Sequence, residues 1–176
     1  MEKKAVFALI SFWFIFSFAR SRPADKEKIN WLSVNEVNMK MKVEPRPVLI
    51  DLYTNWCYWC KVMDKKTYSD PRVVEYINKH FYAIKLNAET EDSVIWNDRS
   101  YQYDLDNKVN DFSIYVTQGR LAFPNTVIFP DVEQMPASIP GFMKPKEIEV
   151  ILTYFGGGSY KMMDFGKYSS NFKSTW

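Results

Sequence analysis

The residues with the clearest capacity for chemistry are Cys57 and Cys60, the two cysteines of a 176-residue chain. They lie in the stretch TNWCYWCK, residues 54–61, with two aromatic residues between them. A pair at this spacing could bind a metal ion, form a structural disulfide, or exchange a disulfide with another molecule. The surrounding sequence distinguishes these three possibilities.

A zinc site is the least favoured of the three. Structural zinc is usually held by four ligands, which come as two clusters of cysteine or histidine. The chain offers one histidine, His80, and no second cluster. His80 also lies at the expected end of a helix, where a surface or capping position accounts for it. We therefore expect no bound metal.

A purely structural disulfide is also disfavoured. In the chain-entropy view, a disulfide stabilises more when it closes a longer loop, and the loop from Cys57 to Cys60 is very short. A chain of this length with 47% hydrophobic residues can bury a core without such a link. A reactive redox pair is the favoured interpretation.

The local sequence places this pair where a strand leads into a helix. VLIDLY, residues 48–53, is an apolar run rich in strand formers, and good helix formers follow the cysteines. Unpaired N–H groups at a helix N-terminus favour thiolate over thiol. We therefore expect Cys57 to be an exposed thiol of low pKa that attacks a disulfide. Cys60 is then the buried thiol that resolves the mixed disulfide.

The other elements follow the pattern of an α/β protein. We expect a capping box at Ser33 and Glu36, and a second helix start at Asp70 and Pro71. The expected helices cover about 34–42, from 71 onward, and about 144–155, and the expected strands cover 48–53, 82–89, 125–129 and 135–139. This order predicts a sheet covered by helices on both faces.

Two segments are harder to interpret from their sequence. Residues 91–118 are polar and irregular, and their scattered aromatic and aliphatic side chains suggest an insertion containing a helix or a pair of helices. Residues 156–176 form a C-terminal extension, which either packs as a small extra element or is a loose tail.

VLIDLYTNWCYWCK resembles the active-site segment of the thioredoxin superfamily, and the resemblance covers about residues 29–155. Asp51 matches the buried acid beneath the cysteines, and Trp56 matches the tryptophan before the first cysteine. Lys85 matches the lysine beside that acid. Pro124 matches the cis-proline that faces the pair, and Gly141 matches the glycine before the last helix.

The variant WCxWCK and the sequence that follows it are similar to exported bacterial thioredoxin-like proteins. These include the thioredoxin-like domain of thiol:disulfide interchange proteins. The resemblance implies a thioredoxin fold of the α/β class, with a central mixed β-sheet flanked by helices and an insertion before the cis-proline strand. It implies a single domain over residues 20–176.

The resemblance also implies a thiol–disulfide oxidoreductase without a cofactor, because the electrons stay on sulfur. Cys57, Cys60, Asp51 and Lys85 are then the catalytic residues. We expect Asp51 to be buried with a raised pKa and to exchange a proton with Cys60, while Lys85 tunes its charge. The implied partners are protein thiols and disulfides, with a membrane electron donor as a candidate, and the protein is expected to be a monomer.

The residues implied to bind substrate surround the cysteines: Trp56, Tyr58, Trp59, Phe123 and Pro124. Here the chain departs from the family pattern. Tyr58-Trp59 replaces Gly-Pro between the cysteines, and Phe123-Pro124-Asn125 replaces the more usual Ile-Pro-Thr. These changes leave the chemistry intact and make the rim bulkier. An alternative is a peptide-binding or chaperone-like module that uses this aromatic rim without redox turnover.

The N-terminus has the features of a secretory signal peptide. Lys3 and Lys4 precede fifteen uncharged, mostly apolar residues, 5–19, which end with the small residues Ser17 and Ala19 at alternate positions. We expect a signal peptide over residues 1–19 and export to the periplasm, with an uncleaved membrane anchor as the alternative. The net charge of +2 is dispersed along the chain, which argues against a nucleic-acid partner.

Overall fold

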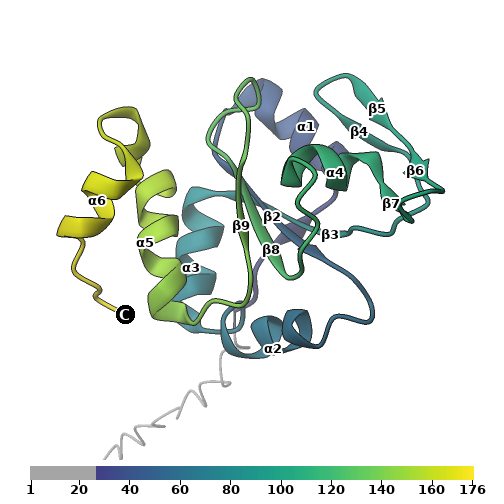
Figure 1. Ribbon diagram of the computed structural model, residues 1–176. Coiled ribbons are helices and arrows are strands. Elements are labelled where there is room, and N and C mark those ends of the chain that lie inside the picture. The colour runs from purple at the N-terminus through teal and green to yellow at the C-terminus, as the bar shows by residue number, and fades with distance from the viewer. Residues whose placement is uncertain (1–26) are drawn as a thin grey trace, which may run out of the picture.

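The computed structural model describes residues 27–176 and is built on a five-stranded sheet (Figure 1). Its strands lie in the order β1 (Trp31–Leu32), β3 (Tyr82–Asn87), β2 (Val48–Tyr53), β8 (Asn125–Phe129) and β9 (Ala137–Pro140). β1, β3 and β2 run parallel, whereas β8 and β9 are antiparallel to their neighbours. The sheet is therefore mixed, as expected from the sequence.

Helices cover both faces of this sheet. The helices are α1 (Val34–Val43), α2 (Tyr58–Lys66), α3 (Pro71–His80), α4 (Asp111–Thr117), α5 (Pro145–Gly156) and α6 (Phe165–Asn171), with a short 3₁₀ turn at Ser159–Lys161. Side chains of α2, α3 and α5 pack together on one face, and those of α1 and α4 pack on the other. Figure 1 shows α6 on the outer side of α5.

The central strand β2 distributes its side chains between the two cores. Leu49 packs in the core under α2, α3 and α5, whereas Ile50 and Leu52 pack in the core under α1 and α4. Because successive residues of a strand point to opposite faces, Asp51 lies on the same face as Leu49. This is the face that carries α2 and its cysteines.

The helix starts follow the sequence signals. Ser33 and Glu36 form the expected capping box of α1. Asp70 caps α3 by accepting a hydrogen bond from the backbone N–H of Arg72, and Pro71 occupies the first turn. β3 ends at Asn87, two residues earlier than expected, and β1 was not expected at all.

The helix expected within the insertion is present as α4, whereas the strands that precede it were not expected. Two small antiparallel pairs precede its one helix, α4: β4 (Val94–Trp96) with β5 (Arg99–Tyr101), and β6 (Tyr103–Asp104) with β7 (Val109–Asn110). Asn97 and Asp98 join the first pair with φ angles of 47° and 60°. Two-residue hairpin turns require such positive φ values, and Asn and Asp tolerate them best after glycine.

The insertion is joined to the main sheet by a buried tryptophan. The Trp96 side chain is fully buried, and its ring lies 4.7 Å from that of Phe129 in β8 and 5.8 Å from that of Phe112 in α4. Burial of large aromatic side chains dominates the energetics of such a contact. The insertion is thus part of the core under α1 and α4.

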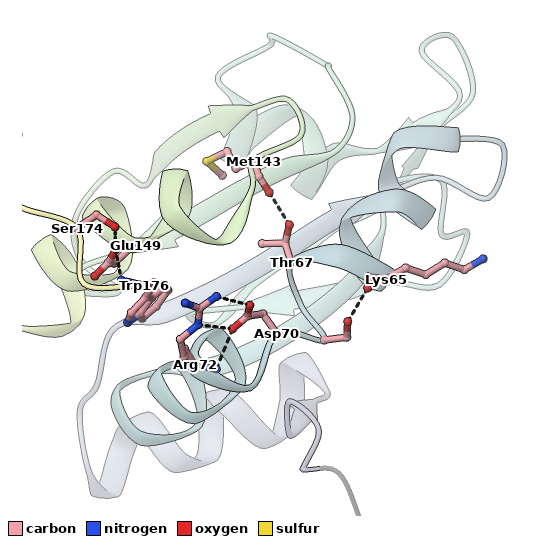
Figure 2. Close-up of polar contacts among 9 residues, drawn as sticks. Lys65, Thr67, Asp70, Arg72, Met143, Glu149, Ser174 and Trp176 are labelled. Carbon is pink, nitrogen blue, oxygen red and sulfur yellow. Dashed lines mark hydrogen bonds and ion pairs between the residues drawn. The ribbon is translucent and has the colours of Figure 1, made fainter.

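The C-terminal extension packs against the domain, which was one of the two expected alternatives. Glu149 of α5 is buried, and its carboxylate accepts hydrogen bonds from Ser174 Oγ at 2.5 Å and from the backbone N–H of Thr175 at 2.8 Å. It also accepts bonds from Thr175 Oγ1 and the backbone N–H of Trp176. Figure 2 shows Ser174 and Trp176 beside Glu149. These bonds lower the pKa of Glu149 although burial alone would raise it.

Among residues 27–176, no helix is long and apolar enough to cross a bilayer. The expected signal peptide, residues 1–19, lies outside the described residues.

We predict that Glu149→Ala releases the last residues of the chain. The substitution leaves the donors of Ser174, Thr175 and Trp176 without their acceptor, and the lost charge-assisted bonds correspond to about 2–3 kcal/mol in the free energy of unfolding. Chemical denaturation measures that loss, and hydrogen exchange of residues 172–176 measures the release. Glu75→Ala, on the exposed side of α3, is the control and should change neither quantity. Unchanged exchange in Glu149→Ala would contradict the prediction.

Candidate redox site

The two cysteines lie at the start of α2 and form a disulfide. Cys57 is the N-cap residue of α2, and its Sγ is bonded to Cys60 Sγ with the two Cα atoms 5.4 Å apart. The backbone N–H of Cys60 donates a hydrogen bond to Cys57 Sγ at 3.0 Å. Because the N-terminal N–H groups of a helix carry partial positive charge, this position stabilises negative charge on Cys57 sulfur.

The expectation that Cys57 is exposed was wrong for this disulfide form. Cys57 is 5% exposed and Cys60 is 4% exposed, so the two residues are equally buried. The reason is that Cys57 Sγ faces the first turn of α2, where it meets both Cys60 Sγ and the Cys60 N–H. The difference between the two cysteines lies in this capping position and not in their exposure.

A charge cluster with one buried carboxylate lies on the sheet face beneath α2. Lys85 Nζ donates to Asp51 Oδ2 at 2.9 Å and also to Asp64 Oδ1. Asp51 and Lys85 are paired neighbours in β2 and β3, whereas Asp64 comes from α2. Lys85 therefore joins the buried sheet carboxylate to the helix that carries the cysteines. The expected contact between Asp51 and Lys85 is confirmed.

Burial controls the proton affinity of this cluster. Burial raises the pKa of Asp51 from 3.8 to about 6, although the positive charge of Lys85 opposes the rise. Burial alone would lower the pKa of Lys85, but the two carboxylates outweigh it and raise that pKa. Asp51 is buried, as predicted, and burial shifts its pKa in the predicted direction.

Sequence reasoning missed Asp64. A signal for it was present, because Asp64 follows Cys60 by four residues in the same helix and residues at that spacing share a helix face. An acid on the cysteine-bearing face of α2 could therefore have been expected near the lysine of the neighbouring strand. Asp64 is the outermost member of the cluster, with its side chain 41% exposed.

Aromatic side chains form an exposed rim around the cysteine pair. The exposed members are Trp56, Tyr58 and Trp59, of which Trp56 is 68% exposed. The Trp56 ring meets that of Phe123 edge to face at 6.0 Å, and its Nε1 donates to Glu89 Oε1 at 2.7 Å. Sequence reasoning missed Glu89, which fixes the orientation of the Trp56 ring.

The rim continues on the far side of Trp59 into the loop after β9. The ring of Trp59 lies 5.6 Å from that of Phe142, a second residue that sequence reasoning missed. Gly141 precedes Phe142 with a φ of 102°, which favours glycine, and its N–H donates to the Pro124 carbonyl at 2.8 Å. We refer to Trp56, Tyr58, Trp59, Phe123 and Phe142 as the aromatic rim.

The segment before β8 presents free backbone groups. The Phe123–Pro124 peptide bond is cis, and Pro124 is buried. Within residues 27–176, the N–H and C=O of Phe123 have no hydrogen-bond partner. An extended peptide can pair with such groups as an added strand would.

His80 lies at the C-terminal end of α3, and its ring stacks on Tyr76 with the centroids 4.3 Å apart. Throughout the described part of the chain, no cluster of three or more potential ligands could hold a metal ion. The histidine thus has a packing contact that accounts for its position.

Comparison with known proteins places these residues in a family. Residues 21–150 match the family described as "Thioredox_DsbH: Protein of unknown function, DUF255". A curated relative, the thiol:disulfide interchange protein DsbD of Vibrio vulnificus, is 25% identical over 141 residues, which cover 77% of this chain. The same match covers 21% of that relative, so the chain spans about a fifth of its length.

Solved structures show the same fold. A thioredoxin-fold protein from Helicobacter pylori aligns with a TM-score of 0.55 and 18% identity, over 84% of each chain. A thioredoxin from Thermus thermophilus aligns with a TM-score of 0.50 and 13% identity, over 82% of this chain and 98% of its own. The expected thioredoxin fold, with its central mixed sheet between helices, is confirmed.

We predict that Asp51→Asn makes stability less dependent on pH. Since the folded-state pKa of Asp51 is raised, the folded protein holds this proton more tightly than the unfolded chain does, and it loses stability as the pH rises from about 4 to about 6. The change from 3.8 to about 6 corresponds to about 3 kcal/mol. Asp51→Asn should therefore gain about 2–3 kcal/mol in unfolding free energy relative to the native sequence between pH 4 and pH 8.

Denaturant unfolding of the oxidised proteins at both pH values measures this gain. The control is Asp106→Asn, which removes an exposed carboxylate and should follow the native pH dependence. Parallel pH profiles for Asp51→Asn and the native protein would contradict the assignment of a raised pKa to Asp51.

Proposed function

Because the chain belongs to the Thioredox_DsbH family, we propose that it is a thiol–disulfide oxidoreductase that exchanges disulfides with protein substrates through Cys57 and Cys60. The family membership, the thioredoxin fold and the bonded cysteine pair together support a thiol–disulfide redox function. The observation that carries the proposal is the hydrogen bond from the Cys60 N–H to Cys57 Sγ at the helix start.

In the reducing direction, the thiolate of Cys57 attacks one sulfur of a substrate disulfide. A bond forms between Cys57 Sγ and that sulfur, and the other substrate sulfur leaves as a thiolate that takes up a proton. Cys60 then loses its proton and attacks Cys57 Sγ. The Cys57–Cys60 disulfide forms, the second substrate thiol is released, and two electrons have passed to the substrate. A dithiol donor must reduce the pair before the next turnover.

We assign Asp51 as the group that accepts the Cys60 proton, directly or through water. Its pKa of about 6 suits a base that must take and return a proton near neutral pH. Lys85 tunes this pKa and holds the carboxylate in place through the 2.9 Å ion pair. Both residues are positioned on the sheet face under α2, which supports these roles.

The substrate is proposed to bind across the aromatic rim. The unpaired N–H and C=O of Phe123 would bond to the backbone of an extended peptide, which demands no particular side chain. Trp56, Tyr58 and Trp59 would contact apolar side chains on either side of the exchanged cysteine.

We further propose export to the periplasm by a signal peptide at residues 1–19, on the basis of Lys3, Lys4 and the apolar run that follows.

We predict that the reduced protein accelerates insulin reduction by dithiothreitol. Cys57→Ser should lower the rate to that of dithiothreitol alone, because the attacking sulfur is lost. Turbidity from the precipitating insulin chain measures the rate. A control variant, Ser170→Ala on the exposed face of α6, should keep the native rate.

The aromatic rim also suits a peptide-binding module without redox turnover. In that case the native protein would not accelerate insulin reduction, and a variant with both cysteines replaced by serine would bind unfolded polypeptide as tightly as the native protein does. This pair of results would contradict the proposed enzyme.

A further inference from the structure

A positively charged groove lies beside the aromatic rim. Its volume is about 670 Å³, within the range of about 300–1,000 Å³ of protein clefts that hold ligands. The groove is lined by two walls, one from the end of α2 and the start of α3, the other from the loop after β9 and the first turn of α5. The residues that matter here are Lys66, Arg72, Phe142, Lys144, Lys146 and Glu147.

A buried hydrogen bond holds the two walls together. Thr67 ends α2, is fully buried, and donates from Oγ1 to the Met143 carbonyl at 2.5 Å. Figure 2 shows this bond between the α2–α3 turn and the segment that leads into α5. The spacing of the walls is therefore set by the fold, and a ligand would enter a formed groove.

Cations exceed carboxylates in this groove. Arg72 pairs with Asp70 at 2.7 Å, and the Glu147 carboxylate accepts the Lys144 backbone N–H at 2.7 Å. The remaining ammonium groups are left for a ligand: across residues 27–176, no carboxylate pairs with those of Lys66, Lys144 or Lys146.

The two helix N-termini at the groove already have carboxylates. Asp70 caps α3, and Glu147 accepts the Lys144 N–H at the start of α5. The positive charge left for a ligand is therefore that of the three lysine ammonium groups, whose complement is a set of carboxylates.

The groove is continuous with the redox site. Phe142 lies in the groove wall and its ring is 5.6 Å from that of Trp59, which stands between the two cysteines. α2 runs from the cysteines to Lys66, and nine residues at about 1.5 Å each place Lys66 about 13 Å along the helix from Cys57. An extended polypeptide covers that distance with about four residues at about 3.3 Å each.

We propose that this groove binds an acidic segment of the polypeptide substrate, three to five residues from the cysteine whose disulfide is exchanged at Cys57. The inference rests on the proposed function and adds a substrate class to it. The ligand is a polypeptide because the groove is continuous with the cysteine pair. Only an extended chain can occupy the groove and cross the aromatic rim to Cys57 at the same time. The carboxylates would meet Lys66, Lys144 and Lys146, which would steer the substrate and fix its direction across the rim.

The test compares disulfide-bonded peptides of one sequence that carry three glutamates or three glutamines at positions three to five from the cysteine, on either side of it. Stopped-flow tryptophan fluorescence of the reduced protein gives the second-order rate constant for each peptide. At low salt we expect the glutamate peptide to react about tenfold faster than the glutamine peptide, for one of the two directions. The ratio should fall below about twofold in 0.5 M salt.

Two variants that remove the same charge assign the effect to the groove. Lys66→Gln/Lys144→Gln/Lys146→Gln should bring the glutamate-to-glutamine ratio below about twofold at low salt. Lys40→Gln/Lys108→Gln/Lys161→Gln changes three exposed lysines on elements outside the groove and should keep the native ratio. A native ratio near one, or equal loss in both variants, would overturn the proposal.

A binding measurement tests this inference independently of the exchange chemistry. In a Cys57→Ser/Cys60→Ser background, fluorescence anisotropy of the labelled glutamate peptide measures binding without disulfide exchange, so a failure of redox activity leaves the inference testable. Tighter binding of the glutamate peptide than the glutamine peptide, lost with the three groove lysines, would support the proposal. Sedimentation with phosphatidylglycerol vesicles that depends on those lysines, without peptide discrimination, would overturn it in favour of a membrane surface.

Discussion

The hydrogen bond from the Cys60 N–H to Cys57 Sγ is the interaction on which the chemistry of this site depends. It exists because Cys57 occupies the N-cap of α2, where the helix has backbone donors without intrahelical partners. The strand β2 ends just before this point and fixes where the helix begins. The position of β2 in the mixed sheet therefore fixes the start of α2. That start determines which of the two equally buried sulfur atoms bears negative charge more easily.

The charge cluster beneath α2 complements this arrangement. Asp51 is almost fully buried, Lys85 is partly exposed and Asp64 is the most exposed of the three. The cluster thus extends from the sheet interior to the protein surface, with one ammonium group between two carboxylates. Burial raises the pKa of Asp51 in spite of that ammonium group, so desolvation outweighs attraction at this position. The cost in stability of an ionised Asp51 is consistent with a functional reason for its presence.

The sequence predicts the parts of the fold that depend on local patterns. The bounds of β2 and β8 follow from apolar runs, and the starts of α1 and α3 follow from their capping residues. Features that depend on distant partners are not predictable in this way. Glu149 lies in an amphipathic helix, yet the donors that allow its burial come from Ser174, Thr175 and Trp176, about 25 residues later.

In the candidate site, too, some features can be predicted from the sequence and others depend on distant partners. Residue type and spacing single out Cys57 and Cys60, whereas Asp51 and Lys85 were expected from the resemblance to the thioredoxin superfamily; their ion pair follows from neighbouring strands. The burial of Cys57 could not be predicted, because it depends on how the sulfur turns toward the helix. Glu89 contacts Trp56, and Phe142 contacts Trp59, although the two residues of each pair lie far apart in the sequence. No sequence pattern predicts contacts at such separations, so both residues were missed.

Trapping of the mixed disulfide shows which of the two cysteines attacks the substrate. Reduced Cys60→Ser protein is mixed with a disulfide-bonded peptide, and mass spectrometry after proteolysis locates the adduct. We expect a stable disulfide between one peptide thiol and Cys57, and far slower adduct formation at Cys60 in the Cys57→Ser variant. Adducts that form equally fast in both variants, or that form only at Cys60, would contradict the role of the helix start in selecting Cys57.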